Sequence, residues 1–151
     1  MINDLLRVFL LSALPISELR GAIPLGLLLY KLPILLTYIV AILGNILPIV
    51  FILKYLEFFY QYFSRWKWGE RFFHWLFQRT RAYKTKYEKY GAIFLLFFVA
   101  IPLPITGAWT GAAIAFVFGI RFWYAFPAIC GGVLVSGLLV TLASLGIISL
   151  I

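Results

Sequence analysis

The sequence predicts an all-α integral membrane protein with two inverted repeats, each a re-entrant helical hairpin followed by a transmembrane helix. Three observations lead to this prediction. Hydrophobic residues make up 64% of the 151 residues and the mean hydropathy is +1.03, both far above the range of soluble domains. Two apolar runs are long enough to cross a bilayer. Two further pairs of apolar runs are each too short to cross and surround a break with proline and polar residues or glycine.

The first pair of short apolar runs lies at the N-terminus. The run from Leu5 to Ile16 is interrupted at about half the depth of a bilayer, and Gly21–Tyr30 is apolar again. The interrupting residues are Pro15, Ser17, Glu18, Arg20 and Pro24. Two short arms around a polar tip predict a re-entrant hairpin. A cleaved signal peptide is not expected, because no small-x-small cleavage site is evident.

A transmembrane helix and a basic segment follow. The run from Leu32 to Leu53 is the first predicted transmembrane helix. From Lys54 to Tyr90 basic and aromatic residues alternate, as in amphipathic helices at a membrane interface. The cations of this segment are Lys54, Arg65, Lys67, Arg71, Arg79, Arg81, Lys84, Lys86 and Lys89. The positive-inside rule predicts that residues 54–90 are cytoplasmic and that both termini lie outside. Flanking apolar runs of membrane length argue against nucleic acid as a partner.

The second pair of short runs surrounds a break from Ile101 to Gly111. Ala92–Ile101 is the entering arm and Ala112–Gly119 the returning arm. Within the break Pro102 and Pro104 each lack a backbone N–H, so the entering helix should stop there. The break also contains two glycines, Gly107 and Gly111, which allow close backbone approach. In hydrocarbon such freed backbone persists only where protein or a water-filled cavity satisfies it, so the break indicates a binding site.

The second predicted transmembrane helix runs from Phe126 to Ile151, which makes the chain one membrane domain, 1–151. Repeat 1 spans 5–53, the interfacial linker 54–90 and repeat 2 92–151. The repeats share identities at a constant offset of 87 positions: Ala13 with Ala100, Pro15 with Pro102, Ala41 with Ala128, Ile42 with Ile129, and Gly44 with Gly131. The first hairpin enters from outside and the second from the cytoplasm, so we expect the two tips to meet near the midplane.

Glu18 and Arg20 are the acid and the base at a hairpin tip. An ionisable group at membrane depth is costly, and this favours a functional role. In the functional hypothesis Glu18 binds and releases a proton, and the planar guanidinium of Arg20 binds an anionic group. The alternative is a mutual ion pair that only neutralises the tip, although residues two apart do not face each other on a regular helix.

Other residues of the breaks could bind the same substrate. Ser17, Thr106 and Thr110, together with the first N–H groups of each returning arm, would donate to an anion, or the hydroxyls could only cap helices. Asn45 could line the cavity or bond to another helix. Pro15, Pro102, Pro104 and Gly107 complete the candidate set. No Ser/His/Asp set, Cys cluster or metal-ligand spacing is present, so no enzyme, cofactor or metal site is predicted.

The residues from Ala13 to Pro24 and from Ile101 to Gly111, with Glu88-Lys89-Tyr90-Gly91 between them, resemble the small multidrug export protein family over nearly the whole chain. That family is similar to the DedA and VTT-domain superfamily, whose members carry two re-entrant hairpins and include polyprenyl-phosphate translocases and lipid scramblases. The resemblance implies that Glu18 and Arg20 are the essential acid and base. Unlike the DedA pattern, no carboxylate or arginine lies near Pro104, which argues against a two-acid proton-coupling scheme.

These observations predict a multi-pass inner-membrane transporter that moves an anionic amphipathic substrate, a polyprenyl phosphate or a phospholipid, with proton coupling through Glu18. Membrane lipids are expected partners, and a homodimer is expected because one such unit has little surface with which to enclose a pathway. One alternative is a proton-coupled exporter of cationic drugs; the four-helix exporters of that type lack a long basic segment and broken helices. The other is a non-transporting membrane-organising protein, which would not need an acid and a base at the tip.

Overall fold

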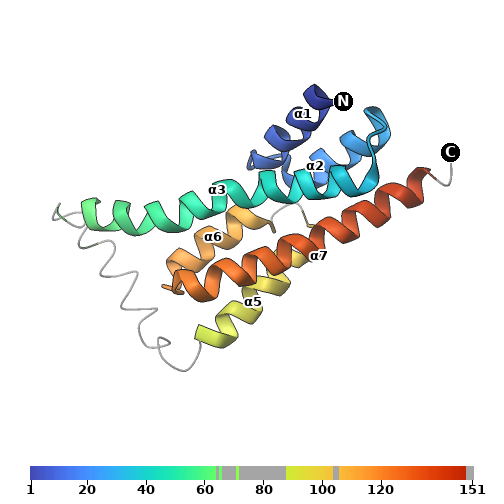
Figure 1. Cartoon of the computed structure of the whole chain (residues 1–151). Coiled ribbons are helices and arrows are strands. Elements are labelled where there is room, and N and C mark those ends of the chain that lie inside the picture. The colour runs from blue at the N-terminus through green and yellow to red at the C-terminus, as the bar shows by residue number, and fades with distance from the viewer. Residues whose placement is uncertain (64, 66–70, 72–87, 104–105, 149–151) are drawn as a thin grey trace.

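Helices make up the secondary structure of the residues that the computed structural model describes, which are 1–63, 65, 71, 88–103 and 106–148. They are α1 (Ile2–Ala13), α2 (Glu18–Pro24), the π-helical turn η1 (Leu25–Leu29), α3 (Ile34–Phe63), α5 (Glu88–Ala100), α6 (Ala108–Val117) and α7 (Phe122–Ile148) (Figure 1). Over these residues the predicted all-α class is confirmed. Most of the predicted interfacial helices lie outside the described residues.

Two helices are long and apolar enough to cross a membrane. They are Ile34–Tyr55 within α3 and Phe122–Gly146 within α7, with mean hydropathies of 2.4 and 2.2. The two helices run side by side in opposite directions (Figure 1). Both predicted long runs are therefore helices of membrane length. The first continues beyond its predicted end at Leu53 as far as Phe63, because no proline or glycine follows to stop it.

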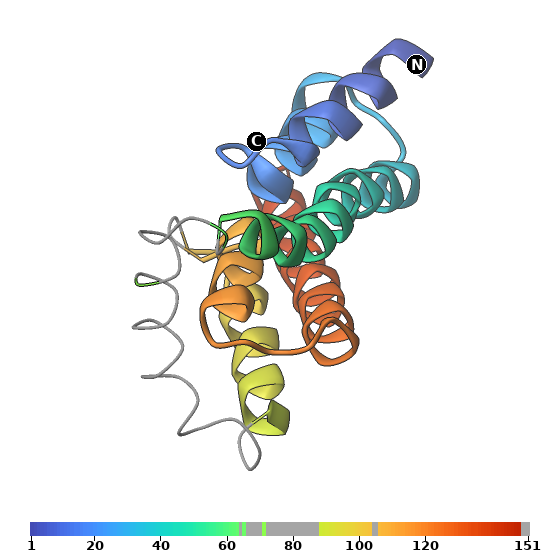
Figure 2. The ribbon, with the colours of Figure 1, turned by 90° about the vertical axis from the view of Figure 1, so that its left-hand side faces the viewer.

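The shorter helices contact the two long helices in a symmetrical pattern. Among the described residues, α1 contacts α3 but not α7, and α5 contacts α7 but not α3. The returning helices α2 and α6 each contact both α3 and α7. Figure 2 shows α1 and α2 on one side of the long pair and α5 on the opposite side. The core lies where α2, α3, α6 and α7 meet, with Ile23, Ile49, Ala112 and Ile129 completely buried.

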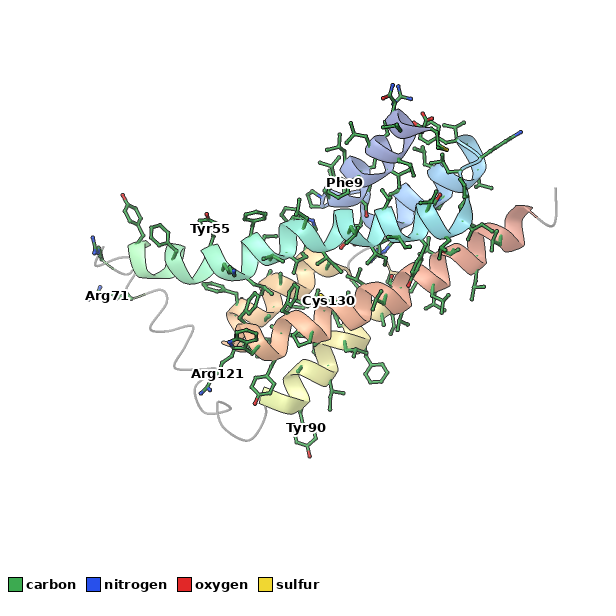
Figure 3. All side chains as sticks on the ribbon, in the orientation of Figure 1. Phe9, Tyr55, Arg71, Tyr90, Arg121 and Cys130 are labelled. Carbon is green, nitrogen blue, oxygen red and sulfur yellow. The ribbon has the colours of Figure 1, made fainter. Side chains whose placement is uncertain are left out.

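Glycines on the long helices set how closely α1 and α5 approach. A Cβ added at Gly44 of α3 would overlap the carbonyl oxygen of Phe9, which lies on α1 (Figure 3). A Cβ added at Gly132 of α7 would lie 2.8 Å from the carbonyl oxygen of Leu96 on α5. Backbone therefore contacts backbone at both crossings, as is common where small residues line helix interfaces in membranes.

Pro24 does not interrupt the first returning arm, contrary to the sequence-based expectation. It lies inside α2, which continues directly into η1. The ring of Pro24 removes one helical hydrogen bond, and the next turn widens, so that the N–H of Tyr30 donates to the carbonyl of Leu25 at 3.1 Å. The first break is thus confined to residues 14–17.

We expect Gly44→Ala to destabilise the protein, because its Cβ meets the backbone of Phe9 and α1 must move outward. Overpacking of this kind costs about 1–3 kcal/mol. The midpoint of thermal unfolding in detergent measures the loss. Gly146→Ala is the matched control on α7, since a Cβ there has nothing within 4 Å, and it should not lower the midpoint. Equal midpoints for Gly44→Ala and the wild type would contradict the close crossing of α1 and α3.

Candidate functional site

The start of α2, directly after the first break, contacts the second break and the start of α6. The first break joins α1 to α2, and the second joins α5 to α6. The side chains of Glu18 and Arg20, both in the first turn of α2, contact Leu103, Gly107 and Trp109. The two predicted breaks therefore lie close together, with Glu18 and Arg20 at their junction; that they are the tips of re-entrant hairpins at the midplane stays a prediction.

Glu18 is buried and has an unusual backbone conformation. Glu18 is only 8% exposed, and its φ of 44° lies in the left-handed region that residues other than glycine rarely adopt. Such a conformation costs about 1–3 kcal/mol and persists only where its surroundings fix it, commonly at binding and catalytic sites. The conformation turns the start of α2 so that the carboxylate faces the second break.

The carboxylate of Glu18 caps the N-terminus of α6. It accepts a hydrogen bond from the backbone N–H of Trp109, the second residue of that helix. This N–H has no carbonyl partner inside the helix, so an outside acceptor stabilises it. The N-cap residue, Gly107, has no side chain that could act as this acceptor. A Cβ at Gly107 would overlap both carboxylate oxygens, so glycine is required for the approach.

Arg20 connects the same two segments. Its Nη1 donates to the backbone carbonyl of Leu103 in the second break, and its Nη2 lies 3.8 Å from Oε2 of Glu18. The ion pair considered as an alternative from the sequence is therefore present, and the positive φ of Glu18 explains how residues two apart can face each other. The pair does more than neutralise itself, since Arg20 also binds the Leu103 carbonyl and Glu18 the backbone N–H of Trp109.

The predicted hydroxyl groups have local roles. Thr106 Oγ1 donates to the carbonyl of Ile101 at 2.5 Å and accepts from the N–H of Leu103 at 3.0 Å, which closes the second break on itself. The prediction that Thr106 or Thr110 caps the restarting helix is therefore wrong, because the cap position is Gly107 and Thr110 lies within α6. Ser17 Oγ likewise donates locally, to the carbonyl of Leu11 near the end of α1 at 2.5 Å.

The candidate prolines fall in the breaks. Pro15 is exposed between α1 and α2, and Pro102 is half-buried two residues after the end of α5. Pro104 lies outside the described residues. The positions of Pro15 and Pro102 just beyond the ends of α1 and α5 fit prolines that stop helices.

Two buried polar side chains, one on α3 and one on α6, have unpaired atoms. Among the described residues, both amide atoms of Asn45 and Nε1 of Trp109 are buried with no hydrogen-bond partner. Asn45 is 1% exposed and lies on the face of α3 that also carries Ile42 and Ile49, in the core against which Trp109 packs. A buried polar group without a partner costs about 1–3 kcal/mol, so these donors are available to a polar ligand.

Sequence reasoning assigned no polar role to Trp109 or Leu103. The N–H of Trp109 and the carbonyl of Leu103 are backbone groups, and they become binding groups only because the helix is broken at that point. The sequence feature that could have indicated the free N–H of Trp109 is its position two residues after Gly107, the N-cap residue of α6. Among the described residues, no group of three or more His, Cys, Asp or Glu side chains could hold a metal ion.

These features define a helical membrane protein in which two breaks in short apolar helices form one charged, buried junction. A family profile described as "Putative small multi-drug export protein" matches residues 18–139, which include both sides of the junction. The chain belongs to this family, as its sequence resemblance predicted. No curated protein and no solved structure matches the sequence.

We expect Gly107→Ala to lower the free energy of unfolding by about 1–3 kcal/mol, because its methyl group takes the place of the Glu18 carboxylate. The φ of Gly107 is 171°, an extended conformation open to any residue, so the effect is steric. In a Glu18→Ala background the same change should be nearly neutral. Thermal unfolding of both singles and the double measures this coupling. Equal losses in the two backgrounds would mean that the carboxylate does not sit against Gly107.

Proposed function

We propose that this protein is a multi-pass inner-membrane transporter that moves an anionic amphipathic substrate, a polyprenyl phosphate or a phospholipid, through the junction of its two hairpins. The observation that carries the proposal is the meeting of Glu18 and Arg20 with the backbone of the second break. A buried acid and base at interrupted helices is the arrangement that membrane transporters use for charged substrates and coupling ions. The family description names export.

The lipid phosphate is favoured as substrate by the resemblance to the DedA and VTT-domain superfamily and by the chemistry of Arg20. Its guanidinium has several fixed donors, which suit the oxygens of a phosphate group. The exposed surface of the helices is apolar, for example at Leu35, Phe97 and Leu138, so a lipid chain could remain in the bilayer while its head group enters the junction.

The packing supports an inverted repeat. Ala13 and Ala100, which occupy equivalent positions, are the last residues of α1 and α5. Each returning helix contacts the long helix of the other repeat, α2 with α7 and α6 with α3. The glycine crossings also correspond approximately, since Gly44 lies against Phe9 and the equivalent Gly131 lies against the side chain of Leu96. In such an arrangement the two repeats would open one central site in turn to each side of the membrane. A homodimer would enclose that site.

The proposed orientation follows from the distribution of charge. Arg71, Tyr90 and Arg121 lie at the end of the molecule opposite both chain termini (Figure 3). The positive-inside rule then assigns that end, with residues 54–90, to the cytoplasm and both termini to the outside. In this orientation α1 and α2 enter the membrane from outside and α5 and α6 from the cytoplasm. The interfacial contact of residues 54–90 with anionic lipids stays a prediction.

A proton-coupled exporter of cationic drugs is the second candidate. Two observations favour it: the family description, and the fact that Glu18 is the buried carboxylate among the described residues, which a cation could bind. The direct contact of Arg20 with the same carboxylate disfavours it, because a cationic drug would have to displace the arginine. Competition between substrates decides between the two candidates.

We expect Arg20→Lys to impair transport of an anionic lipid in reconstituted liposomes, even though it keeps the charge. Arg20 binds the Leu103 carbonyl and Glu18 with different nitrogens, and one ammonium group cannot reproduce that geometry. Glu18→Gln should abolish proton-driven transport and leave binding largely intact. The double change Glu18→Gln with Arg20→Gln is the control, because it removes a structural ion pair without stranding a charge. If the double variant transports lipid at the wild-type rate, Glu18 and Arg20 are a structural ion pair and take no part in transport.

Labelling of single cysteines tests the topology. We expect cysteines placed near Asp4 and near Lys31, in a chain lacking Cys130, both to react with a membrane-impermeant reagent from outside, since they lie at the two ends of the first hairpin. A cysteine at Arg121 is the opposite control and should react only from the cytoplasmic side. Labelling of positions 4 and 31 from opposite faces would make the first hairpin a spanning segment and remove the inverted repeat.

A further inference from the structure

We infer that the carboxylate of Glu18 occupies the anion site of this transporter, so that a phosphate group binds there only after Glu18 has taken up a proton and left. The inference rests on the proposed function and deepens it, since it makes substrate and carboxylate competitors for one place. The contacts that support it are those of Glu18 with Gly107, Trp109 and Arg20.

The junction has the donors that an anion requires. The carboxylate lies at the N-terminus of α6, a helix of 10 residues whose first N–H groups have no helical partner. Arg20 adds a guanidinium whose Nη2 lies 3.8 Å from Oε2 of Glu18. The carboxyl group of Glu18, which α2 carries, already occupies this place next to the backbone N–H of Trp109.

Further donors are unpaired in the core that adjoins the start of α6. Nε1 of Trp109 projects from the first turn of α6 and has no partner, and the amide of Asn45 is 99% buried and also unpaired, among the residues described. Glu18 satisfies neither group. A phosphate has more acceptor oxygens than a carboxylate, so a ligand of that class could satisfy donors that the present occupant leaves without partners.

The carboxylate and a phosphate group cannot share the place. Both oxygens of Glu18 fill the space over Gly107, where even one added carbon atom would overlap them. Two anions at this distance from each other also repel strongly in a site with little water. Binding of the substrate therefore requires that Glu18 either move away or lose its charge.

Protonation makes the departure favourable. A neutral carboxyl group loses its attraction to Arg20 and to the N-terminus of α6, and the left-handed φ of Glu18 is a strain that its movement can relieve. The proton comes from water on the side where the substrate enters. It returns to water on the other side when the substrate leaves and the ionised carboxylate takes its place again. One proton thus accompanies each anion.

Arg20 is the charged group that faces Glu18 within the described residues. On the elements packed against α2, Asp4 and Arg7 of α1 lie in its first two turns, at the end away from the break, and Lys54 of α3 lies over the ring of Phe122. The described parts of α6 and α7 carry no Asp, Glu, Lys, Arg or His. A pH dependence of anion binding would therefore report on Glu18.

The test is isothermal titration of the full chain in phosphatidylcholine nanodiscs with dihexanoyl phosphatidylglycerol, a phosphodiester whose single negative charge is constant from about pH 5 to about pH 8. Inorganic phosphate is titrated in parallel, and dihexanoyl phosphatidylcholine is the zwitterionic control. Titrations in buffers of different ionisation enthalpy give the number of protons taken up on binding. The proteins are the wild type, Glu18→Gln, Glu18→Ala and Arg20→Gln, each checked for wild-type thermal unfolding.

For the wild type we expect affinity to fall by up to about tenfold per pH unit as Glu18 ionises, with uptake of a proton on binding. Glu18→Gln or Glu18→Ala should bind at high pH at least as tightly as the wild type at low pH, without proton uptake. In Glu18→Gln the amide oxygen could still accept a hydrogen bond from α6 and so block the site. Glu18→Ala removes that acceptor and is therefore the second variant. Arg20→Gln should bind weakly throughout. Tighter binding of the lipid than of inorganic phosphate identifies a lipid head group as the ligand, and equal binding identifies phosphate alone.

Two results would overturn the inference and are distinct from failure of the proposed function. Wild-type binding without proton uptake, or weaker binding by both Glu18 variants than by the wild type at high pH, means that Glu18 does not compete with the anion. Absence of binding by every variant at every pH rejects the anionic substrate itself. A cationic drug that binds the wild type more tightly as pH rises supports the exporter candidate instead, because a cation needs the ionised carboxylate.

Discussion

The contact of the Glu18 carboxylate with the first turn of α6 is the interaction that joins α2 to α6. The N-cap residue of α6 is Gly107, which has no side chain with which to cap the helix, so the acceptor comes from α2. Arg20 adds a second bond from α2, to the Leu103 carbonyl in the second break. Because α2 also contacts α7 and α6 contacts α3, this junction links both long helices.

Burial of charge explains why the acid and the base occur together. An isolated carboxylate in a site with little water is costly, and the cost falls when an opposite charge and hydrogen-bond donors surround it. Glu18 has both, from Arg20 and from the backbone of Trp109. The strained φ of Glu18 is the structural cost of this arrangement, and the surrounding contacts offset it. The same contacts would hold the junction closed until one of the charges changes.

Local patterns in the sequence predicted the helices well and their mutual contacts poorly. Length and hydropathy located the two long helices, and the prolines located both breaks, because those signals are local. The tolerance of Pro24 within α2 could not be predicted, since its cost depends on whether the next turn can widen. The cap of α6 could not be predicted either. Thr106 was the nearest hydroxyl, but the acceptor comes from Glu18, far away in the sequence.

The distribution of unpaired polar groups separates the junction from the rest of the core. Away from it, buried hydroxyls donate to nearby carbonyls: Thr141 to Gly137 at 2.7 Å and Ser144 to Val140 at 2.8 Å, both within α7. These two hydroxyl groups donate within their own helix, so their protons are not available to a ligand. The buried unpaired polar side-chain atoms of the described residues belong to Asn45 and Trp109; Trp109 packs against the core cluster and lies in the first turn of α6, next to the strained Glu18. The strain at Glu18 and the unpaired Nε1 of Trp109 lower stability at the junction, as is common at binding sites.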